Sequence, residues 1–131
     1  MTINIKQEDI VDPFAVAPAG IYTIECTHGE QRPSKAGDDM IELRHKITDG
    51  GVEDIDTHLG KNVRDYMVIS GDNSKYGTWR LSQYAQAADI DLDGCEAEDF
   101  IGSTFEVELS VEPATPEFDS ESNRIARVYV D

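Results

Sequence analysis

Hydrophobic and polar residues alternate along several short segments, and this predicts a chain built mainly of β-strands. In residues 104–112 every second position is apolar and polar residues, mostly glutamates, stand between them. Residues 40–48 alternate in the same way, with Glu42, Arg44 and Lys46 on the polar side. A period of two is typical of a strand with one buried face. Three further strands are predicted from β-branched and aromatic residues at positions 21–27, 62–69 and 124–130.

The hydrophobic period changes after the Gly- and Ser-containing break at residues 71–74. The next apolar positions, spaced i, i+3, i+4 and i+7, are Leu81, Tyr84, Ala85 and Ala88. This spacing predicts an amphipathic helix, which we expect to end near Asp89. Trp79, close to the start of this helix, is expected to lie in the core. A short turn is predicted at residues 96–100, before Gly102.

The order of predicted elements is three strands, one helix and two strands. This is the plan of the OB-fold, a small five-stranded Greek-key barrel with its helix between the third and fourth strands. The sequence therefore predicts an all-β fold of small α content, with an N-terminal arm at residues 1–19 and the OB-fold domain at residues 20–131. An immunoglobulin-like sandwich is disfavoured because it needs about seven strands and no helix at this position.

Composition supports one globular domain. The chain has 131 residues and 39% of them are hydrophobic, which is enough for a core. No apolar run is long enough to span a bilayer, and the N-terminus lacks the apolar core of a signal peptide. Cys26 and Cys95 are too few for a disulfide framework, so we expect a reducing cytoplasm.

The net charge of −16 argues against nucleic-acid binding, because phosphates are repelled by a negative field. The charge is unevenly distributed, however. Residues 81–121 contain twelve acidic residues and no Lys or Arg, whereas residues 32–80 hold eight basic residues against nine acidic ones. Exposed charges more than about 10 Å apart are largely screened at 0.1 M salt, so a local cationic face can persist. The total charge therefore does not decide the class of protein.

A single-strand nucleic-acid site combines cations along the backbone path with aromatic rings on which bases stack. OB-folds bind oligonucleotides or oligosaccharides on the face of strands 2 and 3 and on the loops between strands 1–2 and 4–5. The residues predicted to occupy these places, and so to bind nucleic acid, are Arg32, Lys35, Arg44, Lys46, Lys61, Arg64, Tyr66 and Phe118. The alternative interpretation of Tyr66 is packing inside the barrel. The alternative interpretation of these cations is a solvated surface.

Metal-binding and catalytic motifs are weak. The run Asp89-Ile90-Asp91-Leu92-Asp93-Gly94 matches the first half of an EF-hand loop, but Phe100 stands where the bidentate glutamate is required. Weak cation binding by Asp89, Asp91 and Asp93 stays open. Cys26 and the histidines lack zinc-site spacing and are interpreted as a buried thiol and surface histidines. Since no catalytic motif is present either, we expect no metal, no cofactor and no enzyme activity.

The sequence also resembles a known family. The segments Pro18-Ala19-Gly20-Ile21-Tyr22 and Ser34-Lys35-Ala36-Gly37, a later "GxxxxVxV"-like run at residues 102–109 and Asn123-Arg124-Ile125 resemble bacteriophage OB-fold single-stranded-DNA-binding proteins. The resemblance covers about residues 18–130. It implies coating of exposed single strands during phage DNA replication or recombination, and hence a location in the host cytoplasm if the protein is phage-encoded. Lys35 is the residue best matched to a family motif position, followed by Tyr22.

A second hypothesis comes from the acidic segment at residues 82–121. Its carboxylates could mimic a nucleic acid or bind a basic host or replication partner. Reversing charge with Arg44→Glu and Lys46→Glu would abolish function under the first hypothesis and spare it under the second. Oligomeric state, site size and DNA-over-RNA preference stay open.

Overall fold

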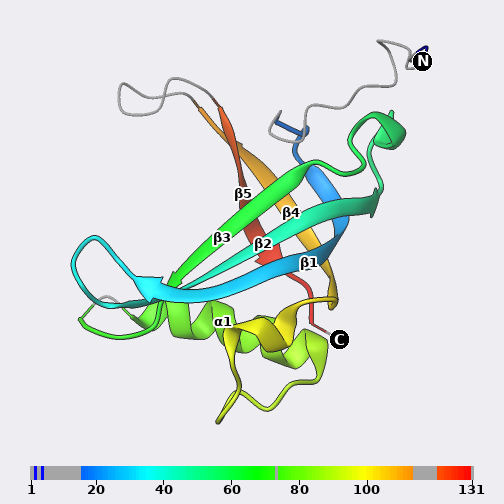
Figure 1. The fold of residues 1–131 in the computed structure, drawn as a ribbon. Helices are drawn as coiled ribbons and strands as arrows, with labels where there is room; N and C mark the ends of the chain where they lie inside the picture. Colours follow the sequence, from blue (N-terminus) through cyan, green and yellow to red (C-terminus); the bar gives the residue numbers. More distant parts are fainter. Residues whose placement is uncertain (1, 3, 5–15, 73, 114–120, 131) are drawn as a thin grey trace.

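The fold is mainly β, with one α-helix between the third and fourth strands, as predicted (Figure 1). The computed structural model describes residues 2, 4, 16–72, 74–113 and 121–130. Its elements are β1 (Gly20–Pro33), β2 (Asp39–Gly50), η2 (Ile55–Thr57), β3 (Asn62–Val68), α1 (Lys75–Ala88), η3 (Ala97–Phe100), β4 (Thr104–Glu112) and β5 (Ser122–Val128), where η denotes a 3-10 helix. Among the described residues, no helix is both long and apolar enough to cross a membrane.

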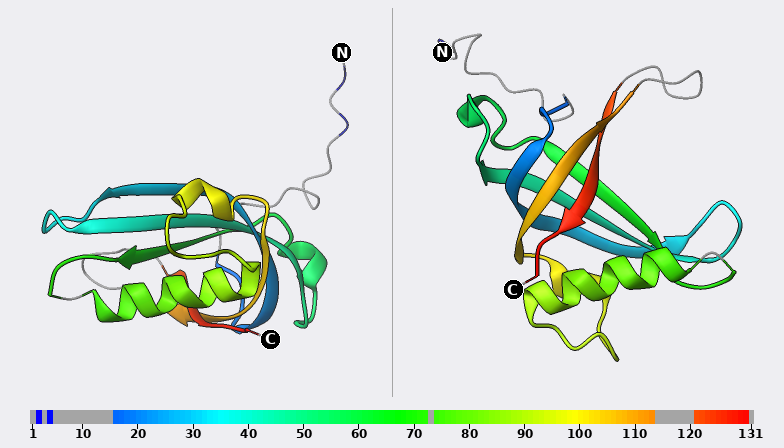
Figure 2. Two further views of the ribbon diagram at one scale, coloured as in Figure 1. Left: turned by 90° about the horizontal axis from the view of Figure 1, so that it is seen from below. Right: turned by 180° about the vertical axis from the view of Figure 1, so that it is seen from behind.

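The five strands form one antiparallel sheet in the order β3-β2-β1-β4-β5. We expected a barrel, but the described strands do not close into one: the sheet is open, with β3 and β5 as its two edges. Figure 2 shows β4 and β5 running across the direction of the other strands. Tyr76 of α1 lines a hollow together with residues of both edges, including Tyr66 and Arg124. Between β3 and β5, a closed barrel would have a ladder of backbone hydrogen bonds, and here side chains line a hollow instead.

The first strand is longer than predicted and joins the two halves of the sheet. It pairs with β4 from Gly20 to Glu25 and with β2 as far as Pro33. Irregularities in its register with β2, at Thr23/Ile24 and Cys26/His28, let the strand bend between these partners. The strand predicted at residues 21–27 thus continues to Pro33, and the connection to β2 is confined to residues 34–38. Backbone pairing with β2 orders a polar segment that has little strand pattern of its own.

Alternating residues of the strands and one face of α1 form the hydrophobic core, as their periods predict. Its largest fully buried apolar members are Tyr22, Ile24, Leu43, Ile47, Met67, Tyr84, Phe100, Leu109 and Ile125. The helix packs closely on β3 at Gly77, where an added Cβ would overlap the Val68 carbonyl oxygen. It ends at Asp89, which adopts a left-handed conformation with φ 56°.

One core residue is a histidine that we interpreted as a surface residue. His45 is fully buried on the inner face of β2, and its ring stacks on Tyr84 at a centroid distance of 5.5 Å. Phe105 contacts the same ring edge-on at 5.8 Å. The period of two that places Leu43 and Ile47 inward also places His45 there, so the sequence did contain the signal.

Most of the predicted arm, residues 1–19, lies outside the described residues. Its last part packs on the domain. Ala17 is fully buried, and its backbone N–H donates to Asn123 Oδ1 at 2.8 Å while Asn123 Nδ2 donates back to the Ala17 carbonyl oxygen at 2.9 Å. This reciprocal pair fixes the chain against β5 just before β1 begins.

Candidate nucleic-acid interface

The outer face of β2 and β3 brings together several of the predicted binding residues. Arg44 lies opposite Arg64 in the register of these strands, and Glu42 lies opposite Tyr66. Opposite residues of an antiparallel pair share a face, so the prediction that Arg64 and Tyr66 point the same way is confirmed. Arg64 and Tyr66 are exposed.

Glu42 organises two of the predicted cations. Its side chain is fully buried and accepts hydrogen bonds from Arg44 Nε at 2.6 Å and Arg32 Nη1 at 2.8 Å. Burial raises the pKa of Glu42, but the hydrogen bonds from Arg44 and Arg32 outweigh it and hold that pKa below its ordinary value. One ionised carboxylate therefore orients both guanidinium groups and neutralises part of their charge.

The remaining predicted residues do not all reach this face. Lys46 forms an ion pair with Glu25 at 3.3 Å. Lys61 is buried, and its Nζ lies 3.3 Å from the Val16 carbonyl oxygen and 2.8 Å from His58 Nδ1, so it is not placed to contact a ligand. Lys35 is exposed in the turn after β1. Phe118 lies outside the described residues.

A hollow of about 500 Å³ lies between the two edges of the open sheet. Arg64, Asp65 and Tyr66 line it from β3, and Tyr76 lines it from the first turn of α1. The residues that line it from β4 and β5 are Glu112, Ser122, Asn123, Arg124 and Ile125. The outer-face residues Arg64 and Tyr66 thus connect this hollow with the surface of β2 and β3.

Three aromatic side chains are unusually exposed around this place. Tyr66 and Tyr76 are each 47% exposed, and Trp79 is 52% exposed. The Tyr76 and Trp79 ring centroids lie 5.8 Å apart. Our prediction that Trp79 belongs to the core is wrong. The helical period that points Leu81 inward places Trp79 on nearly the opposite side of α1, so this exposure was detectable in the sequence.

A buried arginine supports two of these rings from behind. Arg80 is 1% exposed, and its Nη2 donates to the Tyr76 hydroxyl at 2.7 Å and to the Ala126 carbonyl oxygen at 3.4 Å. Its guanidinium carbon lies 5.5 Å from the Tyr76 ring centroid and 5.6 Å from that of Trp79. Both distances are within the range of cation–π attraction. Neither Arg80 nor Tyr76 was among the residues predicted to bind nucleic acid.

Charges inside the hollow are balanced. Arg124 donates to Glu112 at 3.4 Å, and hydrogen bonding to Tyr76, then to Glu112, raises the pKa of Arg124. Burial raises the pKa of Asp65, although the Tyr84 hydroxyl donates a 2.7 Å hydrogen bond to it. The hollow is therefore a near-neutral region lined by arginine and aromatic groups in a strongly acidic protein.

The acidic loop at residues 89–94 shows no assembled cation site. The Asp91 carboxylate accepts a hydrogen bond from the Asp93 backbone N–H at 3.0 Å. Throughout the part of the chain that the structure describes, no three His, Cys, Asp or Glu side chains are grouped to hold a metal ion.

Comparison with known proteins gives a family but no activity. A search of curated proteins finds no match. Residues 3–113 match the family model described as "Protein of unknown function (DUF669)". Because this match spans most of the chain, the protein belongs to the DUF669 family.

Proposed function

We propose that this protein binds single-stranded DNA without sequence specificity and protects exposed strands. The resemblance to phage proteins implies that it does so during phage DNA replication or recombination. The observation that carries the proposal is the grouping of exposed Tyr66, Tyr76 and Trp79 with Arg64 and Arg124 around the open edge of the sheet. Aromatic platforms beside cations are the combination that single-strand binding requires.

Stacking, rather than charge, would supply most of the affinity. Each stacked base contributes roughly 1–3 kcal/mol and needs no particular base identity. The local cations are partly neutralised by Glu42 and Glu112, so phosphates meet a near-neutral surface here and not the field of the whole protein. Duplex DNA hides its base faces and would gain little from these rings.

The strand order supports a relation to the OB-fold, which is a partly open five-stranded barrel. In the order β3-β2-β1-β4-β5, joining β3 to β5 would close such a barrel. We propose that the sheet is an OB-fold opened at the seam between β3 and β5. The single-stranded DNA would lie on the outer face of β2 and β3 and along this opening.

A salt titration tests the proposal. We expect fluorescein-labelled oligo-dT to bind at low salt, with log K falling against log[salt] at a slope of about −2 for three phosphate contacts. Arg64→Gln should reduce the steepness of this slope by about 0.7. Arg127→Gln is the matched control. It makes an equal charge change at an exposed arginine of β5 that does not line the hollow, and it should keep the wild-type slope. Absence of oligo-dT binding at low salt would refute the proposal, and parallel titrations with RNA and duplex define its selectivity.

Removing the carboxylate that restrains two arginines should strengthen binding. In Glu42→Gln, Arg32 and Arg44 lose their shared counter-charge, while the amide oxygen can still accept one hydrogen bond. We expect affinity for oligo-dT to rise about fivefold, since one unit charge at 4 Å is worth roughly 1 kcal/mol in a water-like dielectric. Fluorescence anisotropy at fixed salt measures this change. Unchanged or weaker binding by the folded variant would place the DNA elsewhere.

A further inference from the structure

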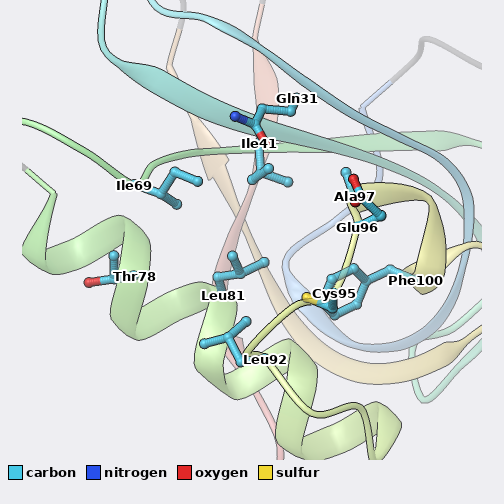
Figure 3. Close-up of a pocket in the computed structure, with 10 residues that line it drawn as sticks. All are labelled: Gln31, Ile41, Ile69, Thr78, Leu81, Leu92, Cys95, Glu96, Ala97 and Phe100. Atoms are coloured by element: carbon cyan, nitrogen blue, oxygen red, sulfur yellow. The ribbon is translucent and has the colours of Figure 1, made fainter.

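A second hollow, of about 270 Å³, lies between the inner face of β1–β2, α1 and the segment that leads into η3 (Figure 3). Its apolar lining comes from Ile41, Ile69, Leu81, Leu92, Cys95 and Phe100. Ile41 and Phe100 are buried, whereas Leu92 is 39% exposed. An apolar cavity of only about 150 Å³ is enough to hold benzene, so this hollow can admit a large apolar side chain.

The surroundings of this hollow are acidic. Glu96 lines it, and exposed Asp91, Asp93, Glu98 and Asp99 lie in the same segment and in η3. The sequence has no Lys or Arg between residues 81 and 121 to offset them. Carboxylates around an apolar pocket repel phosphates and attract Lys and Arg, so the charge complements a basic ligand.

We propose that this hollow, together with its acidic rim, binds a segment of a partner protein in which an apolar side chain is flanked by lysine or arginine. The apolar side chain would enter between Ile41, Leu81 and Phe100, and the basic residues would pair with Glu98 and neighbouring carboxylates. Such a division, with an apolar anchor inside and charges at the rim, is usual for protein interfaces.

The hollow and the outer face of β2 lie on opposite sides of that strand, whereas α1 contributes to both proposed sites, with Tyr76 and Trp79 at the DNA site and Thr78 and Leu81 at the hollow. Ile41 lines the hollow on the inner side, and its neighbour Glu42 holds Arg32 and Arg44 on the outer side. A partner in the hollow therefore leaves the outer face of β2 and β3 free. The proposal does not depend on DNA binding, and its test uses no DNA.

The probe is the fluorescein-labelled peptide Lys-Arg-Gly-Phe-Leu-Gly-Arg-Lys, compared with one that has Ser-Ser in place of Phe-Leu and one that has Gly in place of each Lys and Arg. We expect the parent peptide to bind the full chain at least tenfold more tightly than either control, because burial of Phe or Leu alone supplies about that factor. Equal binding of the parent and Ser-Ser peptides would overturn the proposal, since charge alone would then explain the interaction.

Two variants locate the site. Thr78→Trp places a large ring at the wall of the hollow from an exposed position of α1 and should weaken the parent peptide about tenfold. Glu98→Gln with Asp93→Asn should also weaken it, whereas Glu53→Gln with Glu121→Gln, the matched change of two exposed carboxylates outside this segment, should not. Equal losses in both double variants would overturn the proposal. So would a wild-type dimer that Thr78→Trp converts to a monomer in analytical ultracentrifugation, because a second copy would then occupy the hollow.

Discussion

Replacing Tyr66 and Trp79 by alanine together should lower the affinity for oligo-dT by at least about 30-fold. Two lost platforms at roughly 1–3 kcal/mol each amount to about 2–6 kcal/mol. Both rings are about half exposed, so their removal exposes little core and thermal unfolding should stay close to wild type. Anisotropy titrations of the variant and the wild type at one salt concentration measure the effect.

The control keeps the rings and removes only their polar groups. Tyr66→Phe with Trp79→Phe preserves two aromatic faces and should bind within a few-fold of wild type. Tyr76 is left unchanged in both variants because its hydroxyl accepts a hydrogen bond from buried Arg80, and its loss would disturb the core. If the alanine variant binds as well as the phenylalanine variant, bases do not stack on these residues.

Acid should destabilise the fold through His45. Burial lowers the pKa of this histidine to about 3 from an ordinary value of 6.5. Between these two pH values the unfolded chain binds a proton at His45 that the folded chain does not, so stability falls as pH falls, by about 1.4 kcal/mol per unit. From pH 7.5 to pH 4, this residue alone should cost about 3 kcal/mol of unfolding free energy.

The variant His45→Leu isolates this contribution. Among the described residues, neither ring nitrogen of His45 has a hydrogen-bond partner, and the site between Tyr84 and Phe105 is apolar. Leucine should therefore be tolerated at pH 7.5 within about 1.5 kcal/mol. Urea unfolding at several pH values should give a variant less sensitive to acid than the wild type. The control His28→Gln, at a partly exposed histidine of β1, should keep the acid loss due to His45. Parallel pH profiles for wild type and His45→Leu would contradict the assignment.

Local pattern predicted the secondary structure well where the period was strong. The bounds expected for the strand at residues 104–112 agree with β4, and the stripe that includes Leu81 and Tyr84 does face the core. Pattern failed at residues 28–33, where hydrogen bonding to β2 orders a polar segment that has little period of its own.

The candidate site was only partly predictable. The shared face of Arg64 and Tyr66 follows from the period of two, and the exposure of Trp79 could have been found from the helical period. Nothing in the local sequence indicates that Lys61 turns toward the Val16 carbonyl oxygen, 45 residues away, or that Arg32 reaches the Glu42 carboxylate, because that contact depends on the pairing of β1 with β2.

By itself, the sequence determined the element order, the inward-facing residues and the concentration of acid in residues 81–121, because each depends on spacing or composition alone. Only the tertiary structure decided that the sheet stays open between β3 and β5, since pairing of distant strands depends on how β1 bends and on side chains that meet at the seam. The same long-range packing placed Tyr66, Tyr76 and Arg124 around one hollow, and it formed a second, apolar hollow between the sheet and α1, next to an acidic segment. Local spacing carries no information on either arrangement.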